Sequence, residues 1–78
     1  MNGSEEKNRG EIEEYVRMRP YETKEMNLER RRVFFLVLGK TDSIEQAITF
    51  ANIHNNTKYL NCQYPETLTN RLHSFFSA

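Results

Sequence analysis

The sequence predicts an all-α fold, a small single domain of about four short helices. Three observations support this prediction. Apolar residues recur at the i, i+3 and i+4 spacing of one helix face, residues typical of helix starts stand before several of these segments, and the most strand-like run would have no second strand to pair with. With 78 residues, the chain has room for one small core, whose net stability we expect to be about 3–5 kcal/mol.

The first ten residues are polar and show no apolar periodicity. They predict a flexible N-terminal tail over residues 1–10 and a folded helical domain over residues 11–78. The first helix is predicted over Glu11–Arg19 and ends before Pro20, because proline restricts the residue before it and cannot continue a helix. Its apolar face is formed by Ile12, Tyr15 and Val16.

A second helix is predicted from Thr23 to Leu38, with Gly39 as the left-handed residue that ends it. The apolar run Val33–Leu38 would also suit a buried strand. We favour a helix because the preceding Glu29–Arg32 are good helix formers and a lone strand would have no ladder partner. A helix that is apolar on nearly every side is expected at the centre of the fold.

Ser43, followed three residues later by Gln46, is a capping-box pattern and predicts a third helix over Ile44–His54. A fourth helix is predicted with Pro65 at its first position. Its apolar face consists of Leu68, Leu72, Phe75 and Phe76.

The charge balance, the cysteine count and the length of the apolar runs limit the classes of function that the chain can have. Eleven basic and eleven acidic residues cancel, whereas nucleic-acid-binding proteins normally carry a basic excess. The single cysteine excludes an internal disulfide framework, so we expect a reducing compartment. The longest apolar run is too short to span a bilayer, and we expect a soluble chain.

A catalytic or metal site would have to use the few chemically versatile side chains. Cys62, His54 and His73 could supply a thiol nucleophile with a base, or three metal ligands, but the spacings typical of such sites are absent. No glycine-rich phosphate loop occurs. We therefore expect no enzyme activity, no cofactor and no metal, with a thiol-dependent enzyme built on Cys62 as the weakest alternative.

Arg30, Arg31 and Arg32 resemble a nucleic-acid patch. Successive helical residues are about 100° apart, however, so the three side chains fan around the helix and cannot form one stripe. They could be solvated, form a structural or partner-binding ion pair, or contact nucleic acid directly, and the sequence leaves these alternatives open.

The segment YLNCQYPET, Tyr59–Thr67, differs from the helical pattern. It forms part of a predicted connector, Asn55–Tyr64, that is too apolar for an ordinary solvated loop. A left-handed Asn61 would let Leu60 and Cys62 point inward while a tyrosine projects outward. The two tyrosines either cover the core or supply an anchor that fills a partner's pocket.

This part of the sequence resembles the signature of the XRN-two-binding domain (XTBD) family. The positions that match are Asn56, the pair Tyr59-Leu60, Cys62 and the pair Tyr64-Pro65. Upstream, the positions that match this family are Arg31, Arg32 and Phe34. The resemblance covers about Glu11–Phe76. The sequence departs from the family pattern in having Leu28 and His54 where members often have tryptophan, Asn61 where they have glycine, and a short connection after Leu38.

The resemblance implies a nuclear, non-catalytic helical adaptor that holds the nuclear XRN-type 5′→3′ exoribonuclease in a stable heterodimer and acts in RNA processing and turnover. Tyr64 would be the main anchor, and Phe34 a core residue. No direct contact with nucleic acid or membrane is expected. The alternative is a small RNA-binding module that uses Arg30–Arg32 and exposed tyrosines. The candidate partner-binding residues are Tyr64, Tyr59, Leu60, Arg31, Asn56, Pro65 and Tyr21.

Overall fold

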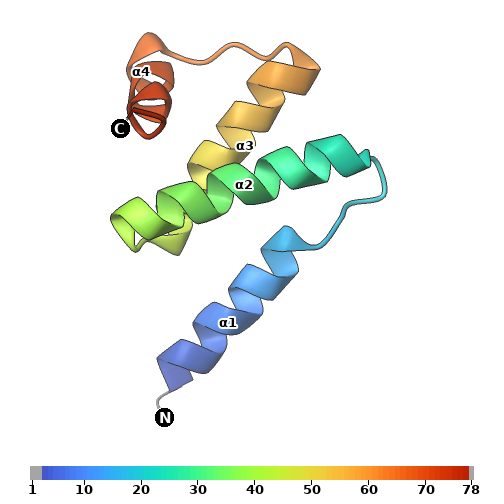
Figure 1. Cartoon of the computed structure of the whole chain (residues 1–78), viewed down its shortest axis with the longest axis vertical. Helices are drawn as coiled ribbons and strands as arrows, with labels where there is room; N and C mark the ends of the chain where they lie inside the picture. The colour runs from blue at the N-terminus through green and yellow to red at the C-terminus, as the bar shows by residue number, and fades with distance from the viewer. Residues whose placement is uncertain (1–2, 78) are drawn as a thin grey trace.

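The computed structural model describes residues 3–77, with the side chains of residues 8–77. Within this part of the chain there is no strand, and the predicted all-α fold is confirmed. No helix among these residues is long and apolar enough to cross a membrane. The helices, in chain order, are α1 (Gly3–Val16), α2 (Lys24–Thr41), α3 (Ile44–Leu60) and α4 (Glu66–Ser74) (Figure 1).

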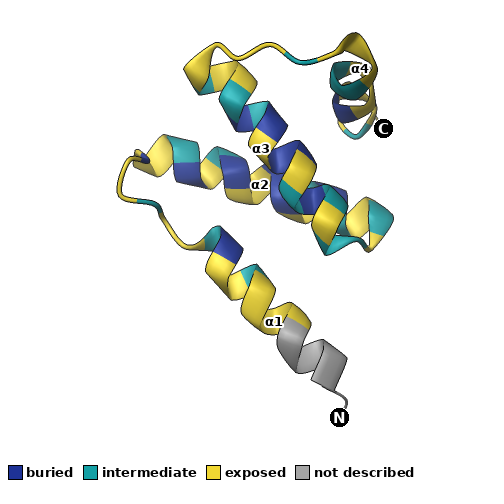
Figure 2. Cartoon of the chain, turned by 180° about the vertical axis from the view of Figure 1, so that it is seen from behind, coloured by how far each residue is buried: buried dark blue, intermediate teal, exposed yellow. Residues whose placement is uncertain are grey.

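Helix α2 lies at the centre of the molecule, as its apolar sequence predicted. It packs most extensively against α3, while α1 and α4 lie on either side of this pair (Figure 1). The core draws mainly on α2 and α3, and Figure 2 shows that buried and exposed residues alternate along both helices. The buried apolar residues are Tyr15, Val33, Phe34, Val37, Ala47, Phe50, Ala51, Ile53 and Leu72.

Helix α1 begins at Gly3 rather than at the predicted Glu11. The predicted helix start is therefore wrong, and residues 3–10 are helical. The division of the chain into a tail and a domain stays a prediction, and residues 1 and 2 lie outside the described residues. A helix that is anchored at one end can extend through polar helix-forming residues, because each added residue gains a backbone hydrogen bond. Periodicity alone cannot detect such an extension, since the extended turns have no apolar face.

The other end of α1 also differs from the prediction, since the helix stops at Val16 and not at Arg19. Side chains from α2 bind the carbonyl groups at this end. Asn27 Nδ2 donates to the Val16 carbonyl at 3.1 Å, and Arg30 donates to the carbonyls of Tyr15 and Arg17. Arg19 also donates to the carbonyls of Glu14 and Arg17. Carbonyl groups at a helix end need such partners, so side chains from α2 and from the linker stabilise the α1 terminus.

Helix α2 begins as predicted, with Thr23 Oγ1 accepting a hydrogen bond from the Met26 amide at 3.1 Å. The prediction that Gly39 ends the helix is wrong. The helix continues to Thr41, and the left-handed residue is Asp42, with φ 57° and its amide donating to the Leu38 carbonyl at 2.8 Å. Aspartate tolerates this conformation, so glycine was not required at this helix end.

Helix α3 begins with the predicted cap, in which Ser43 Oγ accepts from the Gln46 amide at 3.1 Å. It continues through Leu60 instead of stopping at His54. The first six residues of the predicted connector are thus helical, because contacts with α2, described below, support their weak helix propensity. Asn61 does adopt the predicted left-handed conformation, with φ 56°.

Helix α4 is the predicted fourth helix. Pro65 is its N-cap rather than its first residue, and the Pro65 carbonyl accepts from the amides of Leu68 and Thr69. Of the predicted apolar face, Leu72 is buried, whereas Phe76 is 40% exposed. The long connection between α3 and α4 places α4 away from the end of α3 (Figure 1).

Candidate partner-binding site

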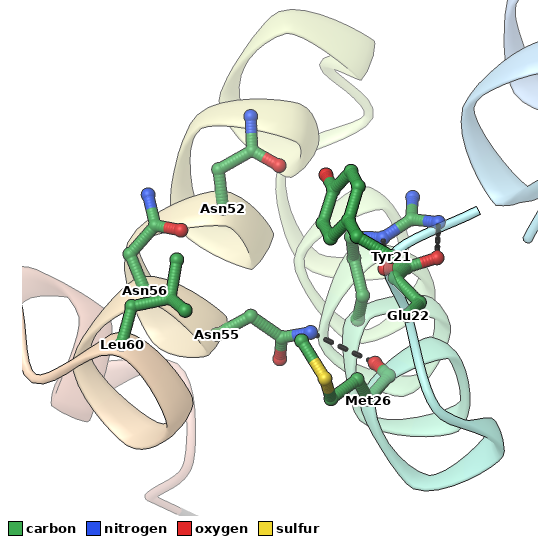
Figure 3. A pocket seen from close by; sticks show the side chains of 8 residues that line it. Tyr21, Glu22, Met26, Asn52, Asn55, Asn56 and Leu60 are labelled. Carbon is green, nitrogen blue, oxygen red and sulfur yellow. Dashed lines mark hydrogen bonds and ion pairs between the residues drawn. The ribbon is translucent and has the colours of Figure 1, made fainter. Parts of the chain in front are cut away.

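A small hollow of about 60 Å³ opens between the segment leading into α2 and the last turns of α3 (Figure 3). Three of the seven predicted partner-binding residues line it together: Tyr21, Asn56 and Leu60. We call it the Tyr21–Leu60 hollow. Its full lining is Tyr21, Glu22, Met26, Arg30, Asn52, Asn55, Asn56 and Leu60.

One wall of the hollow contains a buried ion pair. Arg30 Nε lies 2.7 Å from Glu22 Oε2, and Arg30 Nη2 lies 2.9 Å from Glu22 Oε1. The hydrogen bonds from Arg30 lower the pKa of Glu22 to about 2, and the same pairing raises the pKa of Arg30. Because Arg30 also binds the end of α1 and Glu22 accepts from the Arg19 amide, this pair joins three segments and has a structural role.

Two asparagines of α3, Asn52 and Asn55, also line the hollow. Asn55 Nδ2 donates to the Met26 carbonyl at 2.8 Å (Figure 3), which joins α3 to α2. Asn55 Oδ1 is buried and has no hydrogen-bond partner among the described residues. Asn52 Oδ1 accepts from the Tyr15 hydroxyl at 2.5 Å. Most of the polar groups around the hollow are therefore engaged inside the fold.

The rim of the hollow is apolar and exposed. Tyr21 is 73% exposed and Leu60 is 57% exposed, and they stand on opposite sides of the opening (Figure 3). The prediction that Leu60 and Cys62 point inward is wrong, since both are exposed. Leu60 follows the buried Ile53 by seven residues and shares its side of α3, but it lies in the last turn of the helix, where the core no longer covers it.

Tyr64 contacts Asn56, one of the residues that line the hollow. It is partly buried against the core, and its hydroxyl accepts a hydrogen bond from Asn56 Nδ2 at 2.8 Å. Pro65, the exposed N-cap of α4, follows directly. The Asn56–Tyr64 bond connects the hollow to the segment before α4, so Asn56, Leu60 and Tyr64 belong to one region of the surface.

Tyr59 is oriented differently. Its hydroxyl donates to Glu25 Oε2 at 2.8 Å, which ties α3 to the first turn of α2. Desolvation, together with the hydrogen bond to Glu25, raises the pKa of Tyr59 to about 12. The sequence left two roles open for the tyrosines, covering the core or anchoring a partner. Tyr64 partly covers the core, whereas Tyr59 links α3 to α2.

Arg31 does not lie with the other candidates. Consecutive helical residues are about 100° apart, so Arg31 is turned away from Arg30 and is exposed on the outer side of α2. Arg32 pairs with Glu29 at 2.9 Å. The predicted fan of three arginines is thus confirmed, and one of them, Arg30, forms the structural ion pair considered among the alternatives.

The three residues considered for catalysis or metal binding, Cys62, His54 and His73, do not form a common site. Cys62 is exposed, His73 is exposed on α4, and His54 Nε2 lies 3.0 Å from Glu29 Oε1. Among the described residues, no three His, Cys, Asp or Glu side chains gather in a group that could hold a metal ion.

Sequence reasoning missed several residues of the hollow. Glu22 carried no specific signal, because it stands in the linker before α2 and because Glu25 and Glu29 are closer to Arg30 in the sequence. The sequence also contained no signal for Met26, Asn52 and Asn55, because their position at the hollow depends on how α3 crosses α2. Comparison with protein-family models, with characterised proteins and with solved structures found no match to this chain.

Proposed function

We propose that this chain is a non-catalytic adaptor domain that forms a stable heterodimer with a nuclear XRN-type 5′→3′ exoribonuclease and acts in RNA processing and turnover. The binding surface would be the Tyr21–Leu60 hollow with the neighbouring Tyr64 and Pro65. Nuclear localisation follows from the partner. The proposal combines the XTBD-like pattern of Asn56–Pro65 with the exposure of the side chains at this place.

The observation that carries the proposal is the exposure of Tyr21 and Leu60 on the two sides of one hollow. Large apolar side chains grouped on the surface of a small domain are typical of protein interaction sites. Tyrosine is enriched among residues that dominate binding energy, because its rigid ring buries a large area at low entropic cost. Of the residues that line the hollow, Asn56 and Leu60 belong to the segment that carries the resemblance.

The polar groups near this surface support binding rather than chemistry. Glu22 is held by Arg30 and Asn56 by Tyr64, so these side chains are fixed in position before a partner arrives. A surface that is already ordered loses less conformational freedom on binding. This arrangement suits a stable heterodimer.

The RNA-binding alternative has less support. It requires Arg30–Arg32 to contact phosphates, but Arg30 is 5% exposed and pairs with Glu22. Arg32 pairs with Glu29, which leaves Arg31 as the one arginine of the three without a carboxylate partner among the described residues. A single such cation contributes little phosphate affinity.

Titration calorimetry against the purified exoribonuclease tests the proposal. We expect tight wild-type binding and a loss of at least ~2 kcal/mol, about 30-fold in Kd, for Leu60→Ser and for Tyr21→Ala. Leu28→Ser is the matched control, because Leu28 is a similarly exposed leucine (64%) outside the hollow. Tyr64→Ala is expected to weaken binding as well, with circular dichroism confirming that each variant is folded.

A folded wild-type chain that does not bind the exoribonuclease would overturn the proposal. Equal losses for Leu60→Ser and Leu28→Ser would reject the hollow as the binding surface. Steeply salt-dependent RNA binding in place of exoribonuclease binding would revive the alternative.

A further inference from the structure

The outward side of α2 carries a second surface that the proposed function does not use. We call it the α2 outer face and define it by Lys24, Leu28, Arg31, Arg32 and Phe35. At about 100° per residue these five positions lie on one side of the helix, and all five are exposed. The buried residues of α2 lie on the opposite side: Asn27, Arg30, Val33, Phe34 and Val37.

Two large apolar side chains form the centre of this face. Leu28 is 64% exposed and Phe35 is 47% exposed. They are seven residues apart, two turns or about 10 Å along the helix. The Phe35 ring packs edge-on against the buried Phe34, with ring centroids 5.1 Å apart, so part of its orientation is set by the core.

The flanks of the face are cationic. Neither Lys24 nor Arg31 forms an ion pair with a carboxylate among the described residues. Arg32 pairs with Glu29 and also lies over the Phe76 ring, 5.7 Å from its centroid. Glu29 is at the same time contacted by His54 and Lys58, so its charge is shared among several cations and the face keeps a positive excess.

The α2 outer face is separate from the Tyr21–Leu60 hollow. Met26 and Arg30, the α2 residues that line the hollow, are on the side of the helix that faces α3. Arg31 is about 100° from Arg30 around the helix. A partner bound at the hollow would leave Leu28, Arg31 and Phe35 accessible.

We propose that the α2 outer face binds an acidic amphipathic helix of a protein partner. Apolar side chains at i, i+3 or i+4, and i+7 of such a helix would match the two-turn spacing of Leu28 and Phe35. Carboxylates beside those residues would pair with Lys24 and Arg31 and set the orientation of the helix. This inference does not rest on the proposed exoribonuclease binding.

The features of the face favour a helix over the two other possible occupants. RNA binding uses aromatic platforms and a run of cations along the backbone, whereas this face offers an aliphatic Leu28 beside a single exposed ring. A symmetric dimer through the same face would place Lys24 and Arg31 of one copy against the same cations of the other, which is unfavourable.

Two synthetic helical peptides test the inference with the isotope-labelled full chain in NMR titrations. Both carry leucines at i, i+4 and i+7; one has glutamates beside the leucines and the other has lysines there. We expect the glutamate peptide to shift amide signals of Lys24–Gly39 and to bind at least about tenfold more tightly than the lysine peptide, with a difference that shrinks at high salt.

Variants separate the two surfaces. Leu28→Glu and Arg31→Glu replace exposed helix residues, so both should fold, and each should lower the affinity for the glutamate peptide by about tenfold or more. Leu60→Glu is the matched control at the hollow and should bind the peptide like the wild type. Circular dichroism checks the fold of all three variants.

Equal affinity for the two peptides, or no binding of the glutamate peptide by the folded wild type, would overturn the inference. So would tighter binding of a single-stranded RNA oligonucleotide to the same amides. Self-association that Leu28→Glu abolishes in sedimentation would show instead that a second copy of the chain occupies the face.

Discussion

At the residue scale, the pair between Glu22 and Arg30 is the buried ion pair of the described residues. It lies between α1, the linker and α2, and the side chains of Arg30 and Glu22 are 6% and 2% exposed. The sequence allowed an ion pair for one of three arginines but did not identify Arg30 or its partner. The reason is that Glu22 stands in a linker, where no periodicity fixes the direction of a side chain.

Replacing Glu22 with glutamine should destabilise the chain strongly. Removal of one partner from a buried pair leaves the other charge unpaired and costs about 3–5 kcal/mol, comparable to the whole stability of a domain this small. Thermal unfolding followed by circular dichroism should show Glu22→Gln largely unfolded at room temperature. In the control Glu14→Gln, which removes the exposed partner of Arg17, the melting temperature should change little. Similar melting of the two variants would contradict the structural role of the pair.

Stability should also fall in acid because of Glu22 and Glu29. The folded-state pKa of each is lowered to about 2, from 4.5 for the free side chain. A carboxyl with a lowered folded-state pKa stabilises the fold above its unfolded pKa and loses that contribution as the pH falls through the folded pKa. Urea midpoints should be steady above about pH 5 and decline between about pH 4.5 and 2. A midpoint that is constant down to pH 2 would contradict the two pairings.

At the element scale, the starts of α2 and α3 were easier to predict than their ends. Thr23 and Ser43 cap α2 and α3 through their own side chains, a local signal that the sequence contains. The end of α3 depends on contacts with α2, such as that of Asn55 with Met26. Asn55–Thr57 are weak helix formers, so the sequence predicted a loop there. The tertiary contacts keep these residues helical.

Gly39 provides the clearest test at this scale. It lies inside α2 with no positive φ, and a Cβ added there would meet nothing within 4 Å. Gly39→Ala should therefore raise the free energy of unfolding by about 0.5–1 kcal/mol, because alanine loses less backbone entropy in a helix. Chemical unfolding monitored by circular dichroism measures this change. A loss of stability would indicate that Gly39 is left-handed and ends the helix, as the sequence alone suggested.

At the scale of the whole molecule, α2 separates two surfaces. Its inner side holds the core and one wall of the Tyr21–Leu60 hollow, and its outer side carries Leu28 and Phe35. Of the seven candidate residues, the structure brings Tyr21, Asn56 and Leu60 together and joins Tyr64 to them through Asn56. The motif in the sequence could indicate the α3 side of the hollow, but the opposite side depends on how the segment before α2 approaches α3.

The measurement that tests the central claim most directly is the calorimetric titration of the exoribonuclease with the wild-type chain, Leu60→Ser and Leu28→Ser. The account predicts a tight complex with one chain per exoribonuclease, at least about 30-fold weaker binding for folded Leu60→Ser, and unchanged binding for Leu28→Ser. Absence of heat from the folded wild type, or tight binding retained by Leu60→Ser, would contradict it.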